Sequence, residues 1–137
     1  MSEQNKAVVR RLIEDHWNAK NHALTKELFA PNVTINTPDG VLKGLDGASA
    51  LLEAYATAFP DFRLTIDDLL ADADKVILRW TYQGTQTGPL AEIRATGKRV
   101  SVPNCIGIFR LTAGKVSETH LCWDRRALLE QLGLMPA

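Results

Sequence analysis

The sequence is poor in the features that mark several classes of protein. It has only two cysteines, Cys105 and Cys122, which are too few and too widely spaced for a zinc cluster or a disulfide framework. It has no long apolar run and no internal repeat, and its 16 basic residues balance 16 acidic ones. We therefore expect a cytoplasmic protein with reduced thiols, with no membrane segment and no affinity for nucleic acid.

What the sequence does contain fits a single domain over residues 1–137. A hydrophobic content of 45% and a charged content of 23% are typical of a globular protein with a core of its own. The three histidines have no metal-ligand spacing, and no glycine-rich phosphate loop follows a strand. We expect neither a metal nor a cofactor.

The first 60 residues are predicted to be mainly helical. A buried stripe with helical spacing predicts a helix over residues 3–20 and ends at His16 and Trp17. Shorter helices are predicted over residues 26–30 and 45–59, each followed by a proline. A short strand over residues 33–36 lies between them and ends at Asn36, which fits either a turn or an amide aimed into a pocket.

The rest of the chain is predicted to form four long strands and a final helix. Strands are expected over residues 62–70 and 76–87, followed by a mobile loop over residues 89–98. Two more strands lie between residues 100 and 124 and are joined at Gly114, where a tight turn needs positive φ. Their alternate side chains are mixed in polarity on both faces, which indicates a lined pocket.

This order of elements indicates an α+β domain. Helices come first, then a meander of antiparallel strands, then a helix over residues 125–132. A curved sheet wrapped around the first helix would form a cone with one deep apolar cavity.

Several short segments carry a resemblance to a known family. They are Gly84-Thr85-Gln86-Thr87-Gly88, Ala95-Thr96-Gly97-Lys98-Arg99, Phe109-Arg110-Leu111, Gly114-Lys115-Val116, Trp123-Asp124 and Leu129-Glu130-Gln131-Leu132-Gly133. On these segments the chain resembles the SnoaL-like polyketide cyclase branch of the NTF2-like superfamily. The resemblance implies a cone-shaped α+β fold with a hydrophobic cavity and a homodimer formed through the outer sheet face. Some members are cofactor-free cyclases that use aldol chemistry, whereas others are hydroxylases, isomerases or dehydratases, so the fold alone does not assign a reaction.

The cyclase residues carry over to this chain only in part. With the two sequences aligned on the turn at Gly114, the acid–base aspartate of the cyclases falls at Leu121 and their pocket histidine falls at Gly107. A nearby polar amide falls at Cys105, and only the asparagine of the early strand is matched, by Asn36.

Asp124 and His120 are the alternative catalytic candidates. A carboxylate with a raised pKa can remove a proton next to a carbonyl, and a histidine can donate to the resulting enolate. Asp124 also has the sequence signature of an N-cap, with Trp123 and Leu128 placed as a hydrophobic staple. A capping carboxylate accepts backbone N–H groups, which lower its pKa and weaken it as a base.

Three hypotheses of function remain open at this point. The first is an acid–base enzyme acting on a small, apolar, carbonyl-bearing molecule, cyclase or isomerase in type, with Asp124 as base and His120 as donor. The second is a protein that binds such a molecule without chemistry, and the third is an interaction domain whose cavity is filled by tryptophans. The residues expected to line the cavity are Asn36, Trp17, Tyr55, Trp80 and Cys105.

Overall fold

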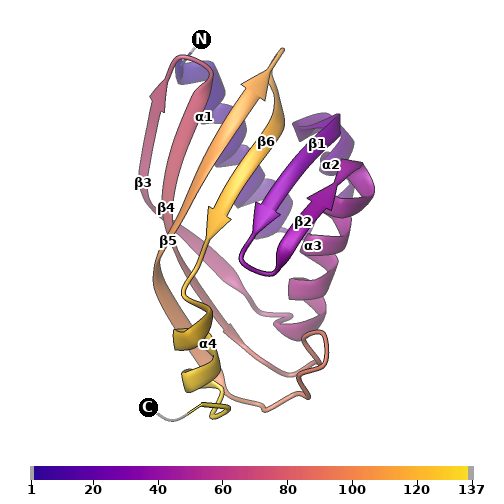
Figure 1. Cartoon of the computed structure of the whole chain (residues 1–137), viewed down its shortest axis with the longest axis vertical. Helices are drawn as coiled ribbons and strands as arrows, with labels where there is room; N and C mark the ends of the chain where they lie inside the picture. The colour runs from indigo at the N-terminus through magenta and orange to yellow at the C-terminus, as the bar shows by residue number, and fades with distance from the viewer. Residues whose placement is uncertain (1, 136–137) are drawn as a thin grey trace.

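The computed structural model describes residues 2–135, which form a curved sheet wrapped around helices (Figure 1). The helical elements are α1 (Ser2–Arg11), the π-helical turn η1 (Leu12–Trp17), the 3-10 turn η2 (His22–Leu24), α2 (Thr25–Leu28), α3 (Gly44–Ala58) and α4 (Arg125–Gln131). The strands are β1 (Phe29–Thr37), β2 (Gly40–Lys43), β3 (Arg63–Asp72), β4 (Lys75–Thr85), β5 (Arg99–Thr112) and β6 (Lys115–Cys122). No helix in this part of the chain is long and apolar enough to cross a bilayer.

The α+β class predicted from the sequence is confirmed, and the sheet is larger than the predicted meander. Its six strands have the order β2-β1-β6-β5-β4-β3. All neighbours are antiparallel except β1 and β6, which are parallel, so the expected purely antiparallel sheet is corrected to a mixed one. Parallel neighbours need a long connection, and here α3 and four strands lie between them in the chain.

The predicted helix over residues 3–20 divides into α1 and a π-helical turn. At its end the Asn18 backbone N–H donates to the Ile13 carbonyl, five residues back, at 2.9 Å. The Asn18 side chain also bonds the backbone of Leu64 on β3 in both directions, at 2.9 and 2.7 Å. These tertiary bonds fix the end of the helix against the sheet, and the wider turn brings Trp17 to the side occupied by Leu12 and Ile13.

The structure differs from the sequence prediction around β1. The strand begins at Phe29, so the predicted helix over residues 26–30 shortens to the single turn of α2. Strand β2, which the sequence did not indicate, pairs with β1 across a tight hairpin. Strand β2 has only four residues, and its Val41 is exposed, so the strand has no alternation of buried and exposed side chains that the sequence could reveal.

The pairing of strands shifts register at four places, and the two shifts that involve β5 change which side chains face the core. Residue pairing slips between β4 and β5 beside Asn104, whose φ is +61°, and Val102 and Cys105 both become buried. Pairing slips again between β5 and β6 at Ser117, so that Val116 and Thr119 both face the core. The mixed strand faces noted in the sequence arise from these slips, because a bulge moves every later side chain to the opposite face.

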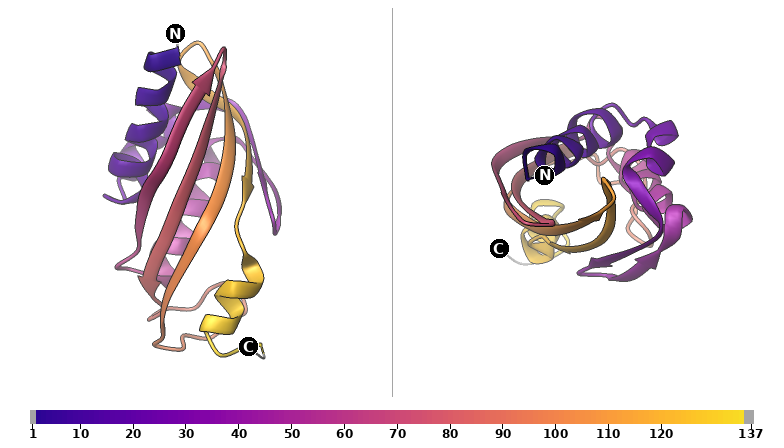
Figure 2. Two further views of the ribbon diagram at one scale, coloured as in Figure 1. Left: turned by 90° about the vertical axis from the view of Figure 1, so that its left-hand side faces the viewer. Right: turned by 90° about the horizontal axis from the view of Figure 1, so that it is seen from above.

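The concave face of the sheet encloses the core together with α1, η1 and α3. Viewed from above, the strands curve around an interior that the helices close on the remaining side (Figure 2). The predicted loop over residues 89–98 closes the end of the cone beside α4. It is held there by bonds between Gln86 and the backbone of Lys98 and Gly97, and by Gly88, whose N–H donates to the Ala58 carbonyl of α3.

Candidate functional site

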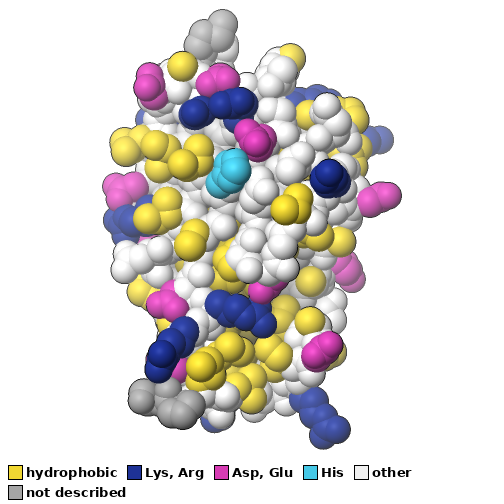
Figure 3. Space-filling model, in the orientation of Figure 1, with side chains coloured by type: hydrophobic (Ala, Val, Ile, Leu, Met, Phe, Trp, Pro, Cys, Tyr) yellow, Lys and Arg dark blue, Asp and Glu magenta, His cyan; other side chains and the backbone are white. Residues whose placement is uncertain are grey.

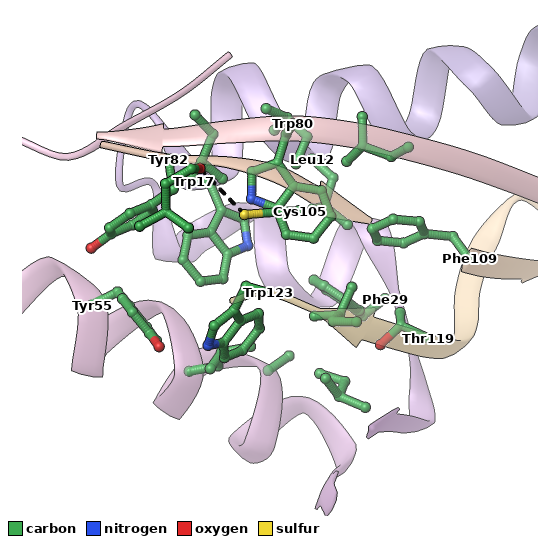
Figure 4. Close-up of a pocket in the computed structure, with 18 of the residues that line it drawn as sticks. Leu12, Trp17, Phe29, Tyr55, Trp80, Tyr82, Cys105, Phe109, Thr119 and Trp123 are labelled. Atoms are coloured by element: carbon green, nitrogen blue, oxygen red, sulfur yellow. Dashed lines mark hydrogen bonds between the residues drawn. The ribbon is translucent and has the colours of Figure 1, made fainter. Parts of the chain in front are cut away.

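An apolar cavity occupies the interior of the cone (Figure 4). Helical elements η1, α3 and α4, the five strands other than β2, and the segment between β6 and α4 contribute side chains to its wall. The wall consists of Leu12, Ile13, Trp17, Phe29, Ile35, Ala48, Leu51, Tyr55, Leu64, Leu78, Trp80, Tyr82, Val102, Cys105, Phe109, Thr119, Leu121, Trp123 and Leu128. The centres of water molecules can occupy about 70 Å³ of it. One water needs about 10–15 Å³ on this measure, so the space suits a small organic molecule.

The chain's three tryptophans all line this cavity. Trp17 comes from η1, Trp80 from β4, and Trp123 from the segment between β6 and α4. Tyr55 of α3 packs edge-on against Trp123, with ring centres 5.9 Å apart, and edge-on against Tyr82 at 5.7 Å. The indoles narrow the cavity without filling it, so the vestigial cavity of the third hypothesis is not what the structure shows.

Three of the polar side-chain atoms of the wall lack a hydrogen-bond partner. The Tyr82 hydroxyl, the Thr119 hydroxyl and the Trp123 indole nitrogen are buried, and none has a hydrogen-bond partner within residues 2–135. Tyr82 is 7% exposed and Thr119 is 1% exposed. Buried polar groups in folded proteins are almost always bonded, so these three atoms call for a partner.

The ionisable groups of the wall keep their protons. Burial raises the pKa of the Tyr55 and Tyr82 hydroxyls well above the ordinary tyrosine value. Burial also raises the pKa of the Cys105 thiol to about 12, and this thiol donates to the Val102 carbonyl at 3.5 Å. A thiol that stays protonated is a poor nucleophile. The wall therefore supplies neutral hydrogen-bonding groups.

The expected lining residues divide into two groups. The structure places Trp17, Tyr55, Trp80 and Cys105 on the cavity wall. It places Asn36 elsewhere, because the Asn36 amide donates to the Thr119 carbonyl at 2.9 Å and so ties β1 to β6. The predicted role of Asn36 in lining the cavity is corrected to this link between strands.

His120 does not reach the cavity. On β6 the inward residues are Thr119 and Leu121, so His120 between them faces outward and its side chain is 59% exposed. Its Nε2 atom lies 3.6 Å from the Glu118 carboxylate, which is also on the outer surface. A donor on this face cannot contact a molecule held inside the cone.

Asp124 caps α4. Its Oδ1 atom accepts the backbone N–H of Ala127 at 2.9 Å, and its side chain is exposed. The expected acid–base pair of Asp124 and His120 is therefore not assembled at the cavity, and the capping alternative describes the geometry.

The two positions that match the cyclase acid and histidine do lie inside. Gly107 on β5 is paired directly with Leu121 on β6, and Leu121 lines the cavity. A Cβ atom at position 107 would lie 2.8 Å from Leu121 and 3.2 Å from Trp80, so glycine makes room for both side chains. This chain therefore carries no ionisable group at the place where the resemblance would put its chemistry.

Neither Thr119 nor Tyr82 was among the residues predicted to line the cavity. Thr119 shares its alternate set with Leu121 and Trp123, and Tyr82 shares one with Trp80, which was the available signal. His16 is fully buried behind Phe29, with ring centres 5.7 Å apart, and its Nε2 lies 2.8 Å from the Thr25 hydroxyl. Burial lowers the pKa of His16 to about 4, so the ring is neutral and packs as part of the core.

Comparison with known proteins identifies the family. The family model described as SnoaL-like polyketide cyclase matches residues 7–132, whereas no match was found among curated proteins. TsrD from Streptomyces laurentii is 31% identical, with 94% of this chain and 97% of that one covered and a TM-score of 0.83. AclR, a proposed hydroxylase from Streptomyces galilaeus, is 27% identical, with 100% of this chain and 89% of that chain covered and a TM-score of 0.87. A proposed SnoaL-like polyketide cyclase from Jannaschia sp. CCS1 is 23% identical, with 98% of this chain and 95% of that chain covered. Its TM-score of 0.90 shows that the two chains share a fold. The chain therefore belongs to the SnoaL-like polyketide cyclase family.

Proposed function

We propose that this protein binds a small, apolar, polyketide-like molecule in the cavity at the centre of the cone. The observation that carries the proposal is a wall built almost wholly from aromatic and aliphatic side chains around a space large enough for a small ligand. Cavities of this composition take up apolar molecules because burial removes apolar surface from water.

The character of the wall favours binding over acid–base chemistry. Removal of a proton next to a carbonyl needs a base whose pKa is near the working pH. Among the side chains that line the cavity, as far as the structure describes the chain, there is no carboxylate and no histidine. The Cys105 thiol and the two tyrosine hydroxyls retain their protons because burial raises their pKa.

A second candidate function is a cofactor-independent cyclase or isomerase, which family membership favours. A reaction in this cavity would depend on the neutral donors Tyr82 and Trp123 to stabilise charge that develops on a carbonyl oxygen. Asp124 would have to leave its capping position before it acted as a base. Recovery of a bound ketone unchanged after long incubation favours binding, and a rearranged product favours the enzyme.

Calorimetric titration with 1-tetralone, a two-ring ketone, tests the binding proposal. Ala48 lines the cavity, so Ala48→Leu extends a larger side chain into the space that the ligand needs. Ala54 lies on the same helix and is exposed, so Ala54→Leu is the matched control. We expect saturable binding to the wild type and to Ala54→Leu, and loss of binding in Ala48→Leu. Equal binding to all three proteins would place the ligand outside the cavity and refute the proposal.

We further propose that two copies pair through the outer face of the sheet. Leu70, Ile77, Ile106 and Ile108 on β3, β4 and β5 are 62%, 42%, 46% and 41% exposed. Figure 3 shows hydrophobic side chains gathered over this part of the sheet, with charged groups around them. Apolar groups that adjoin on a sheet face with a polar rim are typical of an interface between proteins.

A further inference from the structure

The wall of the cavity is only one side chain thick along one side. Most of its members are buried, but some both line the cavity and are partly exposed to solvent, namely Trp17, Leu51, Tyr55, Leu121 and Trp123. Tyr55 of α3 packs edge-on against Trp123, which follows β6, with ring centres 5.9 Å apart. This contact, which we call the mouth, is the place where α3 and the segment after β6 close the cavity against solvent.

The sheet is open beside the mouth. Strands β1 and β6 are paired only as far as Asn36 and His120. Beyond this pair β1 turns back over residues 37–40 into β2, whereas β6 continues through Trp123 into α4 (Figure 1). No strand pairing joins the tip of this hairpin to the segment after β6 in the part of the chain that the structure describes. Side chains alone bridge the opening.

One ion pair spans it. Arg125, the first residue of α4, donates from its guanidinium to the carboxylate of Asp39 at the hairpin tip, and both side chains are 48% exposed. Burial raises the pKa of the Tyr55 hydroxyl, Asp39 raises it further and Arg125 lowers it, so both charges lie near the mouth. The tip holds its own shape, because the Thr37 hydroxyl donates to the Gly40 carbonyl at 2.9 Å and accepts the Asp39 N–H at 3.1 Å.

We propose that the ion pair of Asp39 and Arg125 is a clasp, which holds the hairpin tip over the mouth and admits small molecules to the cavity when it breaks. Strand β2 lies at the edge of the sheet and has only four residues, as is typical of segments that open locally. An exposed ion pair favours its closed form by only about two- to fivefold. Neither charged side chain lines the cavity, so the clasp sets the rates of entry and exit rather than the affinity.

Labelling of the Cys105 thiol measures access to the cavity without any ligand. Cys105 lines the cavity and is 1% exposed, whereas the other thiol, Cys122, is exposed and is removed by Cys122→Ser in every protein tested. The reagent is methyl methanethiosulfonate, which is small and uncharged, and the labelled protein is counted by mass spectrometry. Burial raises the pKa of Cys105, so the thiol reacts slowly and the labelling rate follows the fraction of open molecules.

Loss of either charge should open the mouth. We expect Asp39→Asn and Arg125→Gln each to label about two- to fivefold faster than the parent. The charge swap that combines Asp39→Arg with Arg125→Asp should return the rate to that of the parent, and 1 M salt should speed labelling of the parent but not of the single variants. Glu130→Gln is the matched control, because Glu130 pairs with Arg126 at 2.8 Å within α4 and should leave the rate unchanged.

Urea separates opening of the mouth from unfolding of the whole chain. Local opening exposes little surface, so the labelling rate should stay nearly constant in dilute urea, whereas global unfolding rises steeply with urea. Equal rates in the parent and both single variants, or a charge swap that labels as fast as they do, would overturn the clasp. A parent rate that climbs steeply from the lowest urea concentration would also overturn it. These outcomes do not depend on the binding proposal, because the test contains no ligand, and failure of 1-tetralone to bind would leave the clasp standing.

Discussion

Replacement of Thr119 by valine should stabilise the unliganded protein. Thr119 is 1% exposed, and its buried hydroxyl has no hydrogen-bond partner in the described part of the chain. A buried hydroxyl without a partner costs about 1–3 kcal/mol, whereas valine has nearly the same shape and an equal preference for strands. We expect the free energy of unfolding to rise by about 1–2 kcal/mol.

The assay is urea and thermal unfolding without ligand, followed by circular dichroism. A gain of this size raises the Tm by about 3–6 °C for a chain of this length. Thr81→Val is the control, because it removes a hydroxyl that is already bonded to Asp67 and should leave stability unchanged or lower it. If Thr119→Val destabilises the protein as much as Thr81→Val does, the Thr119 hydroxyl is bonded in the unliganded protein and the reasoning is refuted.

Three further predictions address other parts of the molecule. Asp124→Ala should lower the free energy of unfolding by about 1 kcal/mol through loss of the α4 cap, whereas Asp124→Asn should be nearly neutral. Neither variant should change the affinity for 1-tetralone. A loss of binding in Asp124→Asn would contradict the capping role. Burial lowers the pKa of His16 to about 4, below its unfolded value, so its contribution is complete above pH 6.5 and is lost as the pH falls toward 4. The wild type should therefore lose up to about 3 kcal/mol more than His16→Gln between pH 7 and pH 4 in urea unfolding, and parallel losses would contradict this. Ile108→Glu on the outer sheet face should shift the mass measured by light scattering from dimer to monomer, and a wild type that is already monomeric would refute the dimer.

The fold was predictable where local patterns and tertiary structure agree. On β4 the residues Val76, Leu78, Trp80 and Tyr82 alternate strictly, and the structure buries this set, so the strand itself was predictable from its pattern. The π-helical turn was not predictable from helical spacing, because it depends on bonds between Asn18 and a strand 46 residues away. Strand β2 is too short and too exposed to leave a pattern.

The site was predictable only in part, because strand register decides which side chains enter the cavity. On β6 both alternate sets contain polar and apolar residues, so the sequence did not distinguish Thr119 from His120. The shift in register at Ser117 places Thr119 on the inner face and His120 on the outer face. This shift arises from the pairing of β6 with β5 rather than from any residue of β6 alone. By contrast, the Asp124 cap was visible in the sequence because a capping signature depends only on neighbouring residues.

The central claim is that neutral groups in an apolar cavity bind the ligand. Calorimetric titration of 1-tetralone between about pH 6 and pH 9 tests it most directly, because no group on the wall is expected to titrate in this range. We predict one site per chain and an affinity that does not change with pH. An affinity that follows a titration within this range, or no binding at all, would contradict it.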